Sequence, residues 1–415
     1  MTDGSVSEDD AIWTYVSPSE AHVPEPPVEE QFYLGLSVVR KGLARLRALV
    51  SGEDVLERAE TSDEDRSTEG DGPLPDALRD RVAPPPDWTK AVAALDEVLG
   101  PEPEAMETPI LVHEPAYHDA PSIVEAWGES QAMTVLEAPA RDCLMEEEGA
   151  AWVDAQREEG KPWVLPGLER WWLRTPDGLA FVRSLLDAWA EGTLGRGVIG
   201  VDRDTWRYLR RAWPGQASRR IVLRPLSGKV LARWFWRLAR QGGAPEGTVE
   251  EQRGGGRVLS APGQESGHAA ASLTTNESPS TFLRSLAAFS DGDPGVAWAL
   301  WRRNLRAPSP ATTASAVAEV PPWPDVDRPE RPNDLERSDL LLLHALVLHG
   351  GLTDAALARV TPVDRYERRE RLRMLRRTGL LTKADEAWRV TPFGHPVVCG
   401  LLRDEAHLSD RWSDG

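Results

Sequence analysis

Four side chains that can bind a metal or transfer a proton lie at the end of one short apolar run, Pro109-Ile-Leu-Val-His113, or just after it. They are His113, Glu114, His118 and Asp119, with Tyr117 between the two histidines. Histidine and carboxylate groups bind zinc and act as general acids and bases. However, the histidines stand five residues apart, without a Cys pair or second His pair in register, and Glu169 is the one obvious carboxylate elsewhere. A satisfied polar turn is therefore the preferred interpretation, and a metal or hydrolase site is the alternative.

A second chemical feature is an arginine-rich segment between Asp364 and Arg377. Its seven arginines outnumber its three acidic residues, which leaves four net positive charges. Arginines on one helix can contact phosphates or guanine edges of DNA, and the alternative is a solvated face or a protein-binding face. The residues predicted to contact DNA or a partner are Arg365, Arg368, Arg369, Arg371, Arg373, Arg376, Arg377, Lys383 and Arg389.

The tryptophans suggest a further contact surface. The chain has 17 of them, and most are expected in the core. The adjacent pair Trp171 and Trp172 cannot both point inward from one element, so this pair, with Arg174, is predicted to be an exposed surface for a protein partner.

The composition limits how the chain meets its partners. It has 415 residues, with 48 basic against 67 acidic residues and a formal charge of -19. Only a local basic face could bind nucleic acid, because the net negative charge of the chain repels nucleic acid at long range. The length is sufficient for two or three domains.

No apolar run approaches the length of a membrane span, and the acidic N-terminus does not have the pattern of a signal peptide. Cys143 and Cys399 provide neither a disulfide framework nor a metal site. We therefore expect a cytoplasmic protein with no metal.

The elements that would position these residues are short apolar runs alternating with helical segments from about residue 88 to 241. This alternation predicts an α/β fold with a parallel sheet covered on both faces. Towards the C-terminus, Ser338 to His349, Thr353 to Val360 and Asp364 to Arg377 are predicted helices. Two short strand-like runs and a closing helix from Pro396 to Leu402 follow them. This pattern is typical of a winged helix.

The composition also divides the chain into segments. The apolar stripe of residues 31–50 predicts an amphipathic helix that docks on its own chain or pairs with another protomer. The other segments are an acidic disordered N-terminus (1–30), an acidic linker (51–80), an α/β core (81–240), a flexible Gly/Ser-rich insertion (241–280), a helical lid (281–320), a Pro-rich linker (321–335), the winged helix (336–406) and a tail (407–415).

The order of these parts resembles the AAA+ and STAND-type P-loop ATPases, especially the origin-recognition branch with a helical lid and a C-terminal winged helix. The resemblance covers about residues 88 to 402 and implies a nucleotide cleft at four places. At the first, the family has a glycine-rich loop ending in lysine and Ser or Thr, whereas this chain has Val112-His-Glu-Pro-Ala-Tyr-His-Asp119 without glycine or lysine.

The other three places also depart from the family pattern. Glu169 is the only acidic residue where the magnesium-holding strand would end, and Asp202 and Asp204 stand where a polar phosphate sensor would be. Gly295 stands where the lid would carry an arginine. Four departures together imply a degenerate nucleotide cleft, formed by His113, Glu114, Tyr117, His118, Asp119, Glu169, Asp202, Asp204 and Gly295.

The sequence therefore predicts a pseudo-ATPase that binds neither ATP nor magnesium. We expect a bacterial-type adaptor or regulatory scaffold that engages a protein partner, a second copy or DNA through the winged helix and the Trp-rich core surface. The alternative is a DNA-binding transcriptional regulator whose core serves for oligomerisation or sensing. An active ATPase with an atypical phosphate site is the third interpretation, and it is disfavoured by the absent lysine.

Overall fold

The computed structural model describes most of the chain between residues 12 and 408. The described ranges are 12–27, 72–100, 109–115, 122–141, 143–145, 148–158, 160–215, 219–245, 247–252, 256–259, 279–309, 316–332 and 334–408. The amphipathic helix expected over residues 31–50 lies outside these ranges, as do Tyr117, His118 and Asp119. No helix within them is both long enough and apolar enough to cross a bilayer.

The core is a six-stranded sheet that is parallel except at one edge. Its strand order is β1-β6-β2-β5-β4-β3. The parallel strands are β2 (Ile110–Glu114), β3 (Thr134–Val135), β4 (Trp163–Leu165), β5 (Gly197–Asp202) and β6 (Arg219–Leu223). Each is a short apolar run that the sequence predicts, so the expectation of an α/β fold with a parallel sheet is confirmed.

Helices cover both faces of this sheet. Successive strand residues point to opposite faces, so apolar strands give the sheet two apolar faces to bury. Leu111 and Ile199 pack on one face with α5 (Gly149–Gln156), α6 (Pro176–Ala190) and α7 (Arg203–Ala212). Ile110 and Val198 pack on the other face with α3 (Thr89–Leu99) and α4 (Ile123–Ser130). A sheet buried on both faces explains why its strands have continuous rather than alternating hydrophobicity.

The N-terminal segment adds the antiparallel edge strand. β1 (Tyr15–Val16) pairs with Leu223 and Val222 of β6, and the short 3-10 helix η2 (Pro18–Glu20) follows it. Ile12 and Trp13 are buried in the core. The expectation of a disordered segment over residues 1–30 is therefore wrong for residues 12–27, because a few apolar side chains in an acidic context are enough to cover an open sheet edge.

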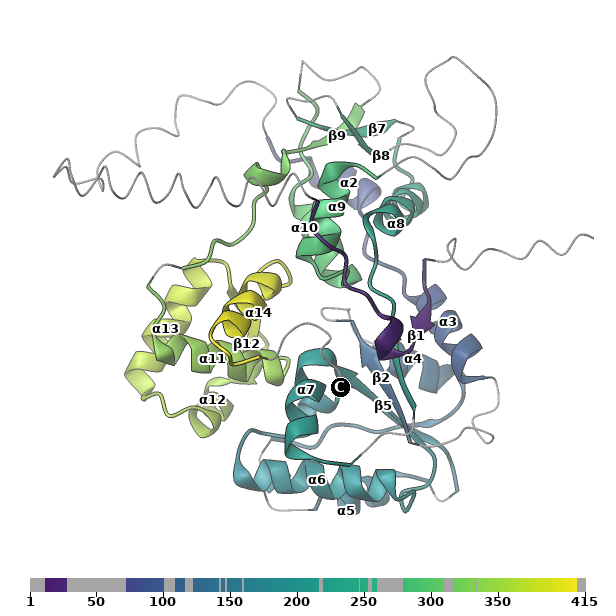
Figure 1. The fold of residues 1–415 in the computed structure, drawn as a ribbon, viewed down its shortest axis with the longest axis vertical. Helices are drawn as coiled ribbons and strands as arrows, with labels where there is room; N and C mark the ends of the chain where they lie inside the picture. The colour runs from purple at the N-terminus through teal and green to yellow at the C-terminus, as the bar shows by residue number, and fades with distance from the viewer. Residues whose placement is uncertain are drawn as a thin grey trace, which may run out of the picture.

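A helical layer lies beyond the sheet (Figure 1). It consists of α2 (Asp76–Val82), α8 (Gly228–Gln241), α9 (Thr281–Phe289) and α10 (Pro294–Arg303). The acidic linker expected over residues 51–80 is wrong at its end, because α2 begins at Asp76 and Leu74 is fully buried.

A small sheet caps this layer. β7 (Thr248–Glu251) pairs with β8 (Arg257–Leu259) and with β9 (Ala316–Val320), in the order β8-β7-β9. The expectation of a flexible insertion over residues 241–280 is therefore wrong for β7 and β8. β7 also pairs with β9, which lies outside the insertion in the sequence, so composition within the segment could not reveal that pairing. The 3-10 helix η7 (Trp323–Asp325) then leads to the C-terminal end of the chain.

Residues 334–408, called the C-terminal module below, contain four helices and a three-stranded sheet. The helices are α11 (Arg337–Leu348), α12 (Asp354–Val360), α13 (Arg365–Arg377) and α14 (His395–Asp404), and the antiparallel sheet has the order β10-β12-β11 (Leu352–Thr353, Ala387–Val390 and Leu381–Ala384). Thr353 and Asp364 cap α12 and α13 through their side chains, at the positions that the sequence indicates. Asp385 and Glu386 have positive φ angles of 49° and 64°, which suits the two-residue turn between β11 and β12.

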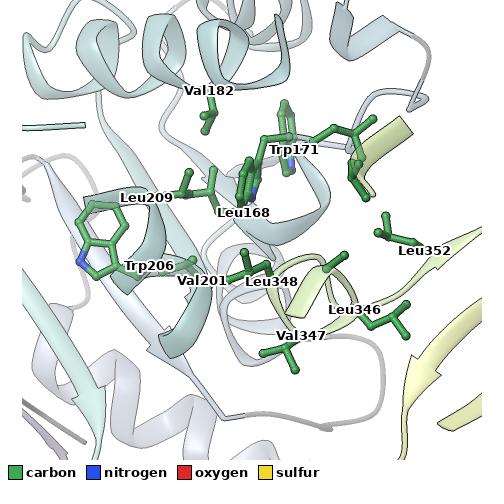
Figure 2. Packing of buried hydrophobic residues seen from close by; sticks show 14 of the residues in the cluster. Leu168, Trp171, Val182, Val201, Trp206, Leu209, Leu346, Val347, Leu348 and Leu352 are labelled. Carbon is green, nitrogen blue, oxygen red and sulfur yellow. The ribbon is translucent and has the colours of Figure 1, made fainter. Parts of the chain in front are cut away.

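The C-terminal module docks on the core through α11. This helix is buried almost all round, and its Leu346, Val347 and Leu348 belong to the same hydrophobic cluster as Leu168 and Trp171 of the core. Figure 2 shows these side chains packed in the space between the two parts. A helix that is apolar on all faces requires partners on all faces, and here the core supplies one of them.

Gly197 offers a test of the close packing inside the core. A Cβ atom at this position would overlap the indole of Trp163, which is fully buried and held by a 2.8 Å hydrogen bond from Nε1 to the Leu194 carbonyl oxygen. Gly197→Ala should therefore lower the free energy of unfolding by about 1–3 kcal/mol, measured by denaturant titration.

The matched control is Gly400→Ala in α14, where no atom lies within 4 Å of the added Cβ. Alanine is the better helix former by about 1 kcal/mol, so this variant should be no less stable than the parent chain. Equal losses in the two variants would contradict the close approach at Gly197.

Candidate functional site

The structure brings the predicted acidic residues together at the carboxyl ends of β2, β4 and β5. In the register of the sheet, Glu114 is opposite Asp202 and His113 is opposite Val201. Glu169 lies in the 3-10 helix η6 (Leu168–Arg170), directly after β4. In open α/β sheets this edge is where ligands bind, so the predicted cleft is at the expected end of the sheet.

Glu114 occupies the position at which such a fold would hold an anion. Its Oε1 accepts a 3.1 Å hydrogen bond from the backbone N–H of Val124, in the first turn of α4. A Cβ atom on Gly200 would overlap the same carboxylate, so the group is wedged between α4 and β5. The N-terminus of a helix attracts negative charge through its unpaired N–H groups and its dipole. Here the chain's own carboxylate satisfies that attraction.

Asp202 and Glu169 are held by structural hydrogen bonds. Asp202 caps α7, and its Oδ1 accepts from the backbone N–H of Asp204 (2.8 Å) and of Thr205 (3.2 Å). Glu169 Oε2 accepts from the N–H of Asp202 at 3.3 Å. Burial raises the pKa of Asp202 to about 7, with Asp204 and Glu169 adding to the rise, and burial also raises the pKa of Glu169.

Asp204 faces residues of the C-terminal module. Its Oδ1 pairs with the guanidinium of Arg207 at 3.2 Å, and its Oδ2 is 3.6 Å from the Sγ of Cys399. His395 Nε2 is 3.4 Å from the same sulfur. Burial opposes ionisation of Asp204, but Arg203, Arg207 and Arg403 hold its pKa well below the usual range. This cluster of Asp204, His395 and Cys399 is not apparent from the sequence, because its members are far apart in the chain.

His113 belongs to the same region. It is 5% exposed, and its Nδ1 is buried without a hydrogen-bond partner within the described residues. Burial, together with the positive charges of Arg220, Arg203 and Arg207, lowers the pKa of His113 to about 3. The imidazole is therefore neutral at physiological pH and is a poor phosphate ligand.

The cavity at this edge has a volume of about 60 Å³. It is lined by the strand ends, the turn between α9 and α10, and α14, and it includes His113, Asp202, Asp204, Asp291, His395 and Cys399. Small-molecule sites commonly measure ~300–1,000 Å³. The space is sufficient for water or an ion and is too small for a nucleoside triphosphate.

Gly295 and its surroundings also differ from a nucleotide-binding lid. Gly295 is buried inside α10 and provides no charged side chain. The nearby charged contact comes from Asp291, whose Oδ2 pairs with Arg203 at 3.4 Å and with Arg403 of α14 at 3.2 Å. Core, helical layer and C-terminal module are therefore joined by one carboxylate.

The prediction that Trp171 and Trp172 form an exposed surface is wrong. Both side chains are 0% exposed. Trp172 packs on Tyr208 of α7, with ring centroids 5.3 Å apart, and on His349, with centroids 4.4 Å apart. The two tryptophans belong to an interface within the chain, because α11 covers this part of the core and the sequence does not show that contact.

Arg174 anchors the same intramolecular interface. Its guanidinium donates to His344 Nδ1 at 2.6 Å and to the carbonyl oxygen of Val360 at 3.2 Å. Two further bonds cross the interface: Thr205 Oγ1 donates to the Leu348 carbonyl at 2.9 Å, and Arg141 donates to the His349 carbonyl at 3.4 Å.

The structure divides the basic residues of the C-terminal module into two groups. Arg368 is buried and donates to the Val363 carbonyl, Arg371 pairs with Glu336 and Asp339, and Lys383 pairs with Asp354 and Glu386. The other predicted contact residues are exposed: Arg365, Arg369, Arg373, Arg376, Arg377 and Arg389. Arg368, Arg371 and Lys383 therefore do not belong to a free basic face.

Tyr366 joins the exposed group, although its residue type and position do not distinguish it in the sequence. Its side chain is 83% exposed, which makes it the one large hydrophobic side chain that is strongly exposed in the described part of the chain. It lies in the first turn of α13, next to Arg365.

Comparison with known proteins adds little beyond the fold. No protein-family model matches the chain, and no curated protein sequence is significantly similar to it. Among solved structures, the Holliday junction branch migration motor RuvB of Thermotoga maritima is similar at 12% identity and a TM-score of 0.30, over 78% of this chain and 94% of that one. A Walker-type ATPase of Pyrococcus abyssi is similar at 10% identity and a TM-score of 0.30, over 76% and 95%.

The ORC2 protein of Aeropyrum pernix is similar at 14% identity and a TM-score of 0.21, over 77% of this chain and 83% of that one. Superpositions at these scores carry no argument about function. The assignment of a parallel α/β core therefore depends on the strand order and pairing described above.

The Arg174 to His344 contact predicts that docking weakens in acid. Arginine can only donate, so His344 Nδ1 must accept, and the imidazole must be neutral. Burial lowers the pKa of His344 to about 3, with Arg174 and His407 adding to the effect. Between the unfolded value near 6.5 and about 3, only the unfolded chain gains the proton, so stability falls as pH decreases through this range.

We therefore expect the free energy of unfolding to fall as the pH decreases from about 6.5, by up to ~1.4 kcal/mol per pH unit for this one group. His344→Gln should reduce that slope in denaturant titrations. His22→Gln, at an exposed histidine of the N-terminal segment, is the control and should leave the slope unchanged. An unchanged slope in His344→Gln would contradict the assignment.

Proposed function

We propose that this chain is a non-catalytic scaffold with an AAA+ ATPase-like core, which binds DNA through α13 of a C-terminal winged-helix module. The observation that carries the first half is the carboxylate of Glu114 at the N-terminus of α4. The observation that carries the second half is the row of exposed arginines beside Tyr366 on α13.

The residues at the carboxyl ends of the strands support the proposal that the core neither binds nor hydrolyses a nucleotide. Glu114 presents negative charge to the helix N-terminus that would bind a phosphate, so a phosphate there would be repelled. Asp202 and Glu169 are engaged with backbone N–H groups. The cavity of about 60 Å³ lies beneath α14 and the turn between α9 and α10. The C-terminal module thus covers the edge that a substrate would have to reach.

The winged-helix interpretation is supported by the order of elements in the C-terminal module. Three helices, α11 to α13, are followed by the antiparallel hairpin of β11 and β12. In this arrangement α13 has the place of a helix that reads the major groove. α13 lies on the side of the module away from α7 and the core sheet (Figure 1).

Its chemistry favours DNA over a protein surface. Arg365, Arg369, Arg373, Arg376 and Arg377 form no ion pair with any described residue, so their charges are available to phosphates. Tyr366 adds an exposed aromatic ring with a hydroxyl group, which can contact the phosphate backbone. Because the whole chain carries a charge of -19, binding should depend on this local face and on low salt.

The proposal that the core does not bind nucleotide predicts that nucleotide leaves the melting temperature unchanged. Magnesium-ATP or ADP at about millimolar concentration should leave the melting temperature unchanged, since a ligand at 100 times its Kd would add about 2.7 kcal/mol of stability. Glu169→Ala serves as a cleft control. A shift that appears in the parent chain and disappears in Glu169→Ala would overturn the non-catalytic assignment.

The proposal that α13 binds DNA predicts that the affinity for DNA depends steeply on salt concentration. In fluorescence anisotropy with a labelled duplex, Arg369→Ala with Arg373→Ala should weaken binding at every sequence and reduce the slope of log K against log salt by about two.

Arg237→Ala is the matched control, because Arg237 is an exposed arginine on α8, outside the C-terminal module. It should bind DNA as the parent chain does. If neither the parent chain nor the control binds duplex DNA at low salt, the exposed face of α13 belongs to a protein contact instead, and the DNA assignment is wrong.

A further inference from the structure

The cluster of Asp204, His395 and Cys399 has the composition and spacing of a metal site. One ligand atom from each residue lies within 4.8 Å of the other two. His395 and Cys399 are four residues apart on α14, so both side chains lie on one face of the helix. Asp204 approaches from the first turn of α7, in the core. Within the described residues this is the one group of three such side chains.

The distances between these atoms fit zinc. Zinc binds thiolate sulfur at about 2.3 Å and imidazole nitrogen or carboxylate oxygen at about 2.0–2.2 Å. Tetrahedral angles then place sulfur about 3.6 Å from either of the other ligand atoms. The sulfur of Cys399 is 3.4 Å from His395 Nε2 and 3.6 Å from Asp204 Oδ2. The sulfur of Cys399 therefore already lies at zinc-site distances from both other ligand atoms.

The surroundings supply the remaining requirements. Arg207 pairs with Asp204 Oδ1 and leaves Oδ2 facing Cys399, and a ligating carboxylate is commonly oriented by such a bond. The three residues line the cavity of about 60 Å³, which has room for a water molecule as fourth ligand. His113 lines the same cavity with a buried, unpartnered Nδ1, an independent sign that a polar group belongs there.

We propose that Asp204, His395 and Cys399 bind one zinc ion, which clamps the C-terminal module onto the carboxyl edge of the core sheet. Binding displaces the thiol proton of Cys399 to solvent, so that the Cys399 thiolate and the Asp204 carboxylate are the two negatively charged ligands of the ion. The proposal is independent of DNA binding by α13, whose arginines lie in a different helix of the module.

The test is the zinc content of the full chain after equilibration with zinc and gel filtration, together with the visible spectrum after loading with cobalt(II). The parent chain should hold one zinc per chain, and its cobalt form should show a thiolate-to-metal charge-transfer band. Cys399→Ser and His395→Gln should lose the bound zinc, and Cys399→Ser should lose the band.

Cys143→Ser is the matched control, because Cys143 is the other cysteine and lies in the 3-10 helix η5 (Cys143–Met145), outside the cavity. It should retain both zinc and the band. Circular dichroism melts of the metal-free variants identify any that fail to fold, in which case Cys399→Ala replaces Cys399→Ser. A parent chain without zinc, or a folded Cys399 variant that retains the band, would overturn the proposal.

Discussion

The docking of α11 against α7 and the 3-10 helix η6 is the contact on which the rest of this structure depends. It buries Trp171 and Trp172, joins the C-terminal module and the core in one hydrophobic cluster, and places α14 over the carboxyl edge of the sheet. An apolar helix such as α11 would expose a large hydrophobic face if the module separated from the core. The interface also contains polar bonds from Arg174, Thr205 and Arg141, which fix the register of the two parts. Hydrophobic burial supplies the attraction, and these bonds select one arrangement.

The docked C-terminal module limits the access of ligands to the carboxyl ends of the strands. In an open α/β fold the carboxyl ends of the strands are accessible to ligands. Here they are covered by α14 and by the turn that contains Asp291, and Glu114 fills the anion position at the N-terminus of α4. The acidic residues at this edge therefore serve as helix caps and as links between parts of the chain. The raised pKa of Asp202 follows from burial next to other carboxylates and does not require a catalytic role.

Local features of the sequence are sufficient to predict most of the helices and strands. Thr353 and Asp364 mark the starts of α12 and α13 in the sequence, because a capping side chain accepts from a backbone N–H group within the next three residues. Strands such as β2 and β5 were recognisable as apolar runs of the right length. The errors at β1 and β7 have a common cause, because each of these strands pairs with a strand far away in the sequence and its own composition resembles that of a loop. β8 pairs with β7 alone and therefore depends on it.

The amino-acid sequence by itself determined the alternation of strands and helices, the basic face of α13 and the absence of a glycine-rich phosphate loop, because these depend on neighbouring residues. Only the tertiary structure decided which side chains meet. It buried Trp171 and Trp172 beneath α11, placed Glu114 at the N-terminus of α4, and brought Asp204 to His395 and Cys399 across more than 190 residues of sequence. It also separated the paired Arg368 and Arg371 from the exposed arginines of the same helix. Contacts of this kind depend on how folded elements pack against one another, and residue type and spacing do not encode that packing locally.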